Sequence, residues 1–265
     1  MILAVHLDGS VIARNLRSAM STYSRSTGEG SLIDLGPAVA SNSGVNYAVF
    51  NALVVSEPVT AAQLSMLLDQ GAEFYRKCGV GWSCWLDEKM IDPQGGPQAA
   101  HLLQARGMQW VAQHDGMLTT QIRPDRRRLL EARTRPVADQ QTRDDFIQVC
   151  CQVFLLPESV TQRIYGSASF WSGLMRGWVG YDGARPVCIA VSAADDGSVG
   201  LYSVATLAAF RGRGFGEFIT RHAIGEAAER SGLNRWSLQS TPEGIGLYRR
   251  LGYQARTRIS VWASE

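Results

Sequence analysis

The sequence predicts an α/β (α+β) protein made of two similar domains. A length of 265 residues exceeds what one small α/β core needs and favours two domains of about 130 residues each. In the second half, a strand-like apolar run over 201–207 leads through a glycine-rich turn into a helical pattern over 217–230. A segment of the first half, 102–109, aligns without gaps on 247–254, at an offset of 145 residues. Only three of these eight positions are identical, so the repeated order of strands and helices is the main support for two similar domains.

The glycine-rich turn before 217–230 has the composition of a phosphate site. Glycines have no Cβ, so a ligand can approach the backbone N–H groups closely. The start of the following helix adds unpaired N–H donors and the positive end of the helix dipole. Two arginines contribute full positive charges. The residues of this predicted site are Arg211, Gly212, Arg213, Gly214, Phe215 and Gly216.

The turn departs from the two common nucleotide-binding motifs. A Rossmann turn needs Gly-x-Gly-x-x-Gly, but counting from Gly212 the last position is Glu217. A P-loop needs Gly-Lys-Ser/Thr, which is absent from the turn. The other interpretation of these glycines is a turn that only starts a helix.

The spacing Arg-x-x-Gly-x-Gly resembles the acyl-CoA pyrophosphate loop of the GNAT superfamily of N-acyltransferases, with Arg211, Gly214 and Gly216 in the motif positions. A second motif follows after a strand over 235–239. The run Leu247–Tyr253 matches the family's ending Leu-Tyr-x-x-x-Gly-aromatic. Two motifs in register are more specific than either alone.

The resemblance implies a fold, a reaction and a donor. Each domain is expected to be a mixed, mostly antiparallel sheet flanked by helices. The expected activity is an N-acetyltransferase that moves an acetyl group from acetyl-CoA to an amine, by direct attack in a ternary complex. The resemblance places Val204, Ala205 and Thr206 along the pantetheine arm, where the strand backbone binds the donor's amides and polarises the thioester carbonyl.

The resemblance also makes Tyr248 the acid that protonates the leaving thiolate. A phenol with an ordinary pKa near 10 stays protonated at neutral pH and can donate to sulfur. The alternative is an aromatic side chain that packs one helix face into the core. No general base is evident, because Glu217 and His222 are expected to face solvent or core. Glu265 or a water molecule remain the candidates.

The second domain is predicted over 142–265. A capping box at Thr142–Asp145 starts a helix through Val153, and a second helical stretch covers 157–165. The strands over 178–181, 185–193 and 198–207 are joined by two hairpin turns and form an antiparallel meander before the glycine-rich turn. A helix is predicted over 243–251.

An aromatic segment follows the second helical stretch of this domain. It contains Tyr165, Phe170, Trp171 and Trp178. In the GNAT family this region borders the acceptor pocket, and the alternative is packing in the core.

The first domain, 1–122, has a similar order of elements without the phosphate chemistry. The predicted elements are strands over 36–43 and 45–55, a helix from a Thr60–Gln63 capping box to Gly79, a strand over 82–86, a helix over 98–106 and a hairpin turned at His114–Gly116. No glycine occurs from Ala52 through Gln70, and Glu57 and Pro58 stand where a phosphate loop would be. A carboxylate repels pyrophosphate and proline removes a donor. We therefore expect a degenerate GNAT-like domain without a cofactor loop, with an unrelated α/β domain as the alternative.

The linker predicted over 123–141 carries a basic cluster, Arg126–Arg128, between Pro124 and Pro136. Three acidic residues interrupt the positive charge, and no aromatic residues alternate with the arginines to stack bases. The formal net charge is only +2. Nucleic acid is therefore not an expected partner.

Composition restricts the compartment and excludes metal chemistry. The five cysteines form no Cys-x-x-Cys pair and are expected to be reduced thiols. The start of the sequence lacks a basic region, which argues against a signal peptide, and no apolar run has membrane-spanning length. We expect a cytoplasmic protein that uses no metal and binds no membrane.

Two function classes remain open from the sequence. The first is the acetyltransferase, acting on a small-molecule or peptide amine. The second is a sensor or regulatory module that binds acyl-CoA without turnover. The presence of Tyr248 favours the enzyme. Neither the amine nor the oligomeric state follows from the sequence.

Overall fold

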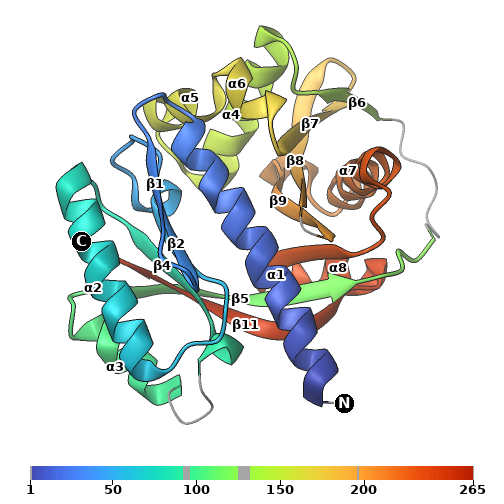
Figure 1. The fold of residues 1–265 in the computed structure, drawn as a ribbon. Coiled ribbons are helices and arrows are strands. Elements are labelled where there is room, and N and C mark those ends of the chain that lie inside the picture. The colour runs from blue at the N-terminus through green and yellow to red at the C-terminus, as the bar shows by residue number, and fades with distance from the viewer. Residues whose placement is uncertain (1, 92–95, 125–131, 196, 265) are drawn as a thin grey trace.

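The structure is a computed structural model that describes residues 2–91, 96–124, 132–195 and 197–264 (Figure 1). Its strands are β1 (Ser31–Asp34), β2 (Ala38–Asn42), β3 (Ala52–Val55), β4 (Ser83–Asp87), β5 (Gln109–Thr119), β6 (Arg133–Pro136), β7 (Met175–Asp182), β8 (Arg185–Asp195), β9 (Ser198–Thr206), β10 (Trp236–Ser240) and β11 (Gln254–Ala263). Its α-helices are α1 (Ile2–Thr22), α2 (Ala61–Cys78), α3 (Gly96–Gln104), α4 (Gln140–Phe154), α5 (Glu158–Tyr165), α6 (Ala168–Ser172), α7 (Phe215–Ser231) and α8 (Ile245–Leu251).

The predicted repeat of elements is confirmed. In each half, three antiparallel strands lead into a helix, a strand parallel to the third, a short helix and a last strand. The segments aligned in the sequence both end a helix in a left-handed glycine, Gly107 (φ 74°) and Gly252 (φ 104°). Two residues later, Gln109 and Gln254 begin the last strands β5 and β11, again 145 residues apart.

The last strands of the two halves are exchanged in one continuous sheet. The strand order is β1-β2-β3-β4-β11-β5-β10-β9-β8-β7-β6. Thus β11 of the second half lies between β4 and β5 of the first, and β5 lies between β11 and β10. All of these central pairings are antiparallel. Neither half completes its own sheet without the other.

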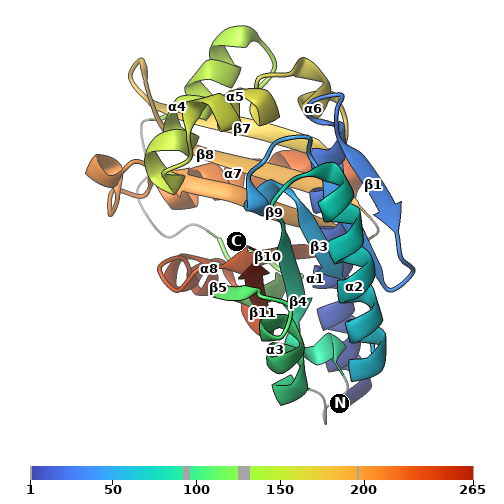
Figure 2. The ribbon, with the colours of Figure 1, turned by 90° about the vertical axis from the view of Figure 1, so that its left-hand side faces the viewer.

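Helices cover both faces of this sheet. Helix α1 crosses its middle and contacts strands from both halves (Figure 1). Asn15 of α1 donates to the carbonyls of Ala193 and Ser198 at 3.2 and 3.1 Å, and accepts from the Tyr202 hydroxyl at 2.6 Å. Helices α4, α5 and α6 lie on one side of β7–β9 and α7 on the other (Figures 1 and 2). Helices α2 and α3 close a smaller core over β2–β4.

The hairpin predicted at 114–116 is wrong, because β5 runs straight through these residues. Gly116 lies opposite Gln239 on β10 and Thr257 on β11. A Cβ on Gly116 would lie 2.4 Å from the Thr257 side chain, so this glycine allows close approach of β11 and makes no turn. Long-range pairing on both edges of β5 overrides the local turn signal.

Two predicted boundaries also differ from the structure. Of the strand expected over 45–55, only 52–55 forms a strand. The Asn51 amide donates to the carbonyls of Val45 and Gly81 at 2.9 Å and holds an irregular segment before it. Helix α4 begins at Gln140, since Asp139 is its N-cap and Thr142 is the third residue of the capping box. The capping box at Thr60 and Gln63 of α2 is confirmed.

Other expectations concern the linker, the cysteines and membrane spans. Strand β6, within the predicted linker, pairs with β7, while the cluster 126–128 lies outside the described residues. The domain division near 122 stays a prediction. All five cysteines are free thiols, and Cys84, Cys150 and Cys188 are buried. No helix in the described ranges is long and apolar enough to cross a membrane.

We predict that a fragment of residues 123–265 does not fold stably. It lacks β5, so β10 and β11 would both expose the edges that β5 covers in the intact chain. Far-UV circular dichroism and size-exclusion chromatography of the fragment should show a poorly folded or aggregated product, whereas the full chain is monodisperse. A monomeric fragment with a cooperative melt would contradict this prediction.

We predict that Asp87 makes stability decrease as pH rises from about 4 to about 6. Its side chain is buried between the halves and accepts from the Thr257 hydroxyl, and burial raises the carboxyl pKa from 3.8 to about 6. The folded state therefore binds a proton more tightly than the unfolded state, which favours folding below pH 4 and is lost above 6. The effect is at most roughly 3 kcal/mol.

Urea denaturation at several pH values tests this prediction through Asp87→Asn. The substitution should reduce the decrease in stability between pH 4 and 6. Asp69→Asn is the control, because Asp69 is exposed and Arg106 lowers its pKa. An unchanged pH profile in Asp87→Asn would show that this carboxyl does not titrate in that range.

Candidate functional site

Strands β9 and β10 separate at their carboxyl ends. They pair in parallel only where Val199–Leu201 lies beside Trp236–Leu238. Beyond this point β9 continues to Thr206 with β8 as its partner, and a register shift interrupts that pairing between Tyr202 and Ala205. Ser203, within the shift, has a left-handed backbone (φ 48°), which is uncommon outside glycine. The edge of 202–206 that faces away from β8 is thus not paired with β10, and it includes Val204, Ala205 and Thr206.

The predicted phosphate turn directly follows this free edge. Gly212 (φ 76°) and Gly214 (φ 99°) have backbones that favour glycine, and among the described residues no atom outside the turn lies within 4 Å of a Cβ built on either. The space next to each of these two glycines is therefore open. Gly214 is the N-cap of α7 and provides no side-chain cap, so the first N–H groups of α7 receive no bond from it. Gly216 lies near Thr206 Oγ1 and Leu247, since a Cβ there would be 3.5 and 3.6 Å from them.

The side chains of the turn are only partly available to a ligand. Arg211 Nε donates to the Thr206 carbonyl at 3.2 Å. Arg213 donates to Asp182 at 3.1 Å and lies over the rings of Phe210 and Phe215, 5.0 and 5.3 Å from their centroids. Phe215 is itself buried, so its contribution to a ligand would be its backbone N–H. The backbone of the turn, more than its arginines, is presented to a ligand.

Tyr248 lies on α8, next to the end of β10. Its ring is 8 % exposed and meets Tyr253 edge-on at 5.8 Å between centroids. A Cβ on Gly244 would be 3.0 Å from this ring and 2.9 Å from Ser240 Oγ, which places Tyr248 beside the last residue of β10. Burial raises the Tyr248 pKa above its ordinary value of 10, so the phenol is protonated at neutral pH. The ring packs in the core and carries a proton that it can donate.

Glu217 and His222, the two residues of α7 considered as general bases, are engaged elsewhere. Glu217 is buried and accepts from Arg221 at 2.7 and 3.0 Å. The Nε2 atom of His222 lies 3.1 Å from Thr134 Oγ1, and burial lowers the pKa of this imidazole. Both therefore have structural roles. Glu265 lies outside the described residues.

The aromatic segment packs in the core. Tyr165, Phe170 and Trp171 contact one another with centroid separations of 4.9 to 5.8 Å, and the Tyr165 hydroxyl also bonds the Tyr23 hydroxyl, just after α1, at 3.2 Å. Trp171 lies on α6, before β7 begins. Trp178 lies in the middle of β7, opposite Ala190 on β8, and Ala190 is level with the register shift between Tyr202 and Ala205 of β9.

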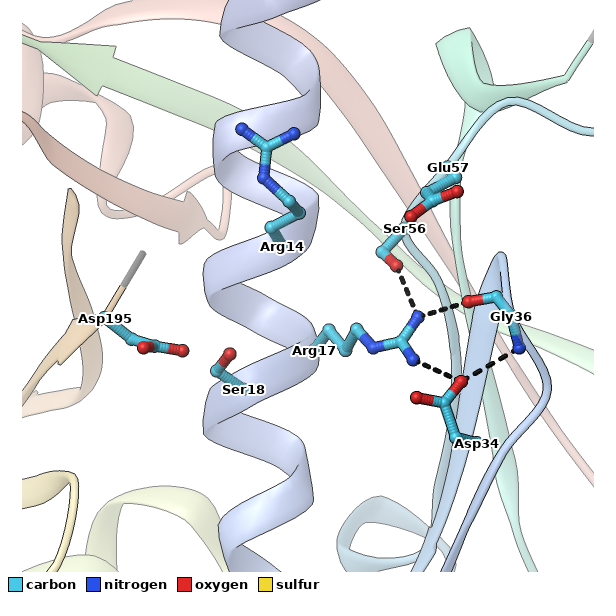
Figure 3. Close-up of a pocket in the computed structure, with 8 residues that line it drawn as sticks. All are labelled: Arg14, Arg17, Ser18, Asp34, Gly36, Ser56, Glu57 and Asp195. Carbon is cyan, nitrogen blue, oxygen red and sulfur yellow. Dashed lines mark hydrogen bonds and ion pairs between the residues drawn. The ribbon is translucent and has the colours of Figure 1, made fainter. Parts of the chain in front are cut away.

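The equivalent turn of the first half, between β3 and α2, already has protein groups as hydrogen-bond partners. The Thr60–Gln63 capping box satisfies donors at the start of α2. Arg17 reaches across from α1 and donates to Gly36 O at 2.7 Å, Ser56 Oγ at 3.1 Å and Asp34 at 2.7 Å (Figure 3).

Around Arg17 is a pocket of about 540 Å³ whose lining includes the carboxylates of Asp34, Glu57 and Asp195 (Figure 3). Arg14 and Arg17 line the same pocket, so its charge is mixed, and Asp34 is paired with Arg17. The two helix starts thus differ in kind, since α2 is capped by its own side chains and α7 is not.

No group of three or more His, Cys, Asp or Glu side chains in the described part of the chain is arranged to hold a metal ion.

Comparison with known proteins finds a family match in the second half of the chain. Residues 174–255, from the end of α6 to the start of β11, match the family model described as an acetyltransferase (GNAT) domain. No curated protein sequence matches the chain.

Solved structures with the same fold span nearly the whole chain. A GCN5-related N-acetyltransferase from Kribbella flavida is 18 % identical, with a TM-score of 0.72 over 97 % of this chain and 95 % of that one. One from Sphaerobacter thermophilus is also 18 % identical, with a TM-score of 0.59 over 88 % and 82 %. A tandem GNAT protein from the clavulanic acid biosynthesis pathway is 11 % identical, with a TM-score of 0.57 over 90 % and 84 %. At these identities the likeness concerns the fold.

We predict that Gly214→Glu strongly weakens CoA binding. Calorimetric titration of the intact chain should give one equivalent of CoA per chain for the wild type and none for Gly214→Glu, because the carboxylate would occupy the open space before the turn.

Gly214→Ala is the matched control for this prediction, because it imposes the same backbone strain at φ 99° without added charge. It should weaken binding less, and Arg211→Ala should also weaken it less, since the backbone donors remain. Unchanged CoA affinity in folded Gly214→Glu would exclude the turn as the phosphate site. Binding of a second equivalent of CoA by the wild type would contradict the prediction that the first half has no cofactor site.

Proposed function

The chain carries a GNAT acetyltransferase domain, a family whose donor is acyl-CoA, and on this premise we propose that it is an N-acetyltransferase. It would transfer an acetyl group from acetyl-CoA to an amine by direct attack in a ternary complex. The observation that carries the proposal is the uncapped, glycine-rich start of α7 beside the free edge of β9. The same turn of the first half has neither property.

The donor would be held mainly by backbone groups. The N–H groups at the start of α7 and the open space before Gly212 and Gly214 suit a pyrophosphate. The unpaired edge over Val204–Thr206 offers donors and acceptors to the amides of a pantetheine arm. These are backbone groups, which nearly every residue has. Binding through them therefore requires no particular side chains on β9, and its sequence shows no clear motif.

The reaction needs three things from the protein. It needs proximity between the amine and the thioester, donors for the developing oxyanion, and a proton for the leaving thiolate. The edge of β9 is suited to the first two. Tyr248 is suited to the third, because burial keeps its phenol protonated and α8 lies against the start of α7 through the Leu247–Gly216 contact.

Neither Glu217 nor His222 of α7 is the proposed general base. Glu217 is held by Arg221 and His222 by Thr134, so a water molecule or Glu265 stays the candidate for deprotonating the amine. An amine that arrives neutral would need no strong base.

A sensor that binds acyl-CoA without turnover is the second candidate function. It predicts CoA binding but no thiol release with any amine. A thiol-release assay on the intact chain, with acetyl-CoA and a panel of small amines, antibiotics, amino acids and peptide amino termini, separates the two. Release with at least one amine supports the enzyme.

We predict that Tyr248→Phe lowers turnover on the order of 10² to 10⁴ fold, the usual contribution of general acid catalysis. Affinity for acetyl-CoA should change little, because the substitution keeps the ring and its packing. The measurement is kcat by thiol release, with CoA affinity by calorimetry.

Tyr253→Phe is the matched control for this prediction. The Tyr253 ring touches Tyr248, and its buried hydroxyl has no hydrogen-bond partner among the described residues, so its removal should leave turnover and stability nearly unchanged. Full activity of Tyr248→Phe, with chemistry rate-limiting, would show that another group protonates the thiolate.

A further inference from the structure

A second pocket lies at the far end of α7 from the phosphate turn. It has a volume of about 410 Å³ and is formed where β6 ends, α4 and β7 begin, and α7 ends. Helix α7 has 17 residues, so its two ends are about 24 Å apart. The pocket is therefore separate from the proposed acyl-transfer site. Its volume is in the range of small-molecule sites.

The charged side chains that line this pocket are all arginines. They are Arg143 of α4, Arg176 of β7 and Arg230 of α7, and no described lining residue is acidic. Arg143 donates to Gln140 Oε1 at 2.8 Å, and Arg176 donates to the Trp171 carbonyl, so both contact neutral oxygens. The three charges are held together without a carboxylate in the lining.

The acidic groups near these arginines offset little of their charge. Burial lowers the pKa of Arg230, the positive charge of Arg176 lowers it further, and Glu226 one turn earlier opposes this effect. Asp139, before α4, is paired with Arg135. The carboxyl end of the α7 dipole adds roughly half a negative charge. Three guanidinium groups therefore leave an excess of positive charge.

Two indole rings form rigid walls of the same pocket. Trp171 is fixed by its Nε1 bond to the Tyr165 carbonyl at 2.8 Å. A Cβ on Gly177 would be only 2.4 Å from the Trp171 ring. Because Gly177 has no side chain, the ring can pack directly against the backbone of β7. Trp178 meets the His222 ring at 4.6 Å and 88°. The walls are in place before any ligand arrives.

We propose that this pocket binds a small organic anion with a flat ring, carrying a phosphate or carboxylate head. The arginines are donors only, and guanidinium groups match planar or tetrahedral oxyanions with paired hydrogen bonds. The indole walls suit a flat, apolar body. An amine acceptor would be repelled from this pocket, so the site is distinct from the one that receives the acetyl group. Binding there would also relieve the mutual repulsion of the arginines and stabilise the fold.

Calorimetric titration of the intact chain tests the proposal with phenyl phosphate and benzoate as probes. It is run with and without saturating CoA, so that a probe bound at the phosphate turn is recognised by competition. We expect one equivalent of an aryl anion, unaffected by CoA, with inorganic phosphate weaker and phenol not bound. The tighter of the two aryl anions identifies the head group.

Arg230→Gln should weaken binding of the aryl anion by ten-fold or more, the usual effect of losing a charge-assisted contact. Arg143→Gln is a second variant, should Arg230→Gln fail to fold. Arg25→Gln is the control, because Arg25 is exposed on the surface outside the pocket. Absence of saturable binding, competition by CoA, or equal affinity in Arg230→Gln and the wild type would each overturn the proposal. Inorganic phosphate that binds as tightly as phenyl phosphate would show that no ring is recognised.

Discussion

The exchange of β5 and β11 at the centre of the sheet is the constraint on which the rest of the structure depends. Strand β5 is paired on both edges by strands of the second half, and β11 is paired on both edges by strands of the first. Removing either strand would leave unpaired backbone groups in the middle of the sheet, where such groups cost stability. The first half is therefore a structural part of the proposed site even though it carries no phosphate turn. It supplies β5, which supports β10, and β10 in turn ends beside Tyr248.

Two helix starts with the same topological position have opposite chemistry. Helix α2 satisfies its own first donors through the Thr60–Gln63 capping box, and Arg17 donates to Gly36 and Asp34 beside it. Helix α7 begins at a glycine without a side-chain cap. The start of α2 is therefore capped by its own side chains, and the start of α7 is not. This difference assigns the proposed cofactor site to the second half and leaves the first half as support.

Helix α7 connects the two proposed binding regions. Its amino end presents backbone donors to the phosphate turn, and its carboxyl end contributes Arg230 to the arginine pocket. Between them, Arg221 donates to the Arg123 carbonyl and His222 bonds Thr134, and these contacts bind the helix to its surroundings. A rigid helix can couple the two proposed anion sites only by moving as one body. The sites are therefore expected to bind their ligands independently unless α7 shifts as a whole.

The sequence alone determined the local features of this protein, and tertiary structure decided the long-range ones. The order of strands and helices, the Thr60 cap and the strand-turn-helix placement of Gly214 follow from residues close together in the chain, because caps, turns and periodicity act over a few residues. A local turn signal also gave the wrong prediction of a hairpin at His114–Gly116. There, pairing with β10 and β11, more than 100 residues away, keeps the chain in one strand. Tertiary contacts also directed Arg213 to Asp182 and His222 to Thr134. They brought Arg143, Arg176 and Arg230 together from three separate elements, and no local pattern could predict this, because partner choice depends on which strands pair and which faces they bury.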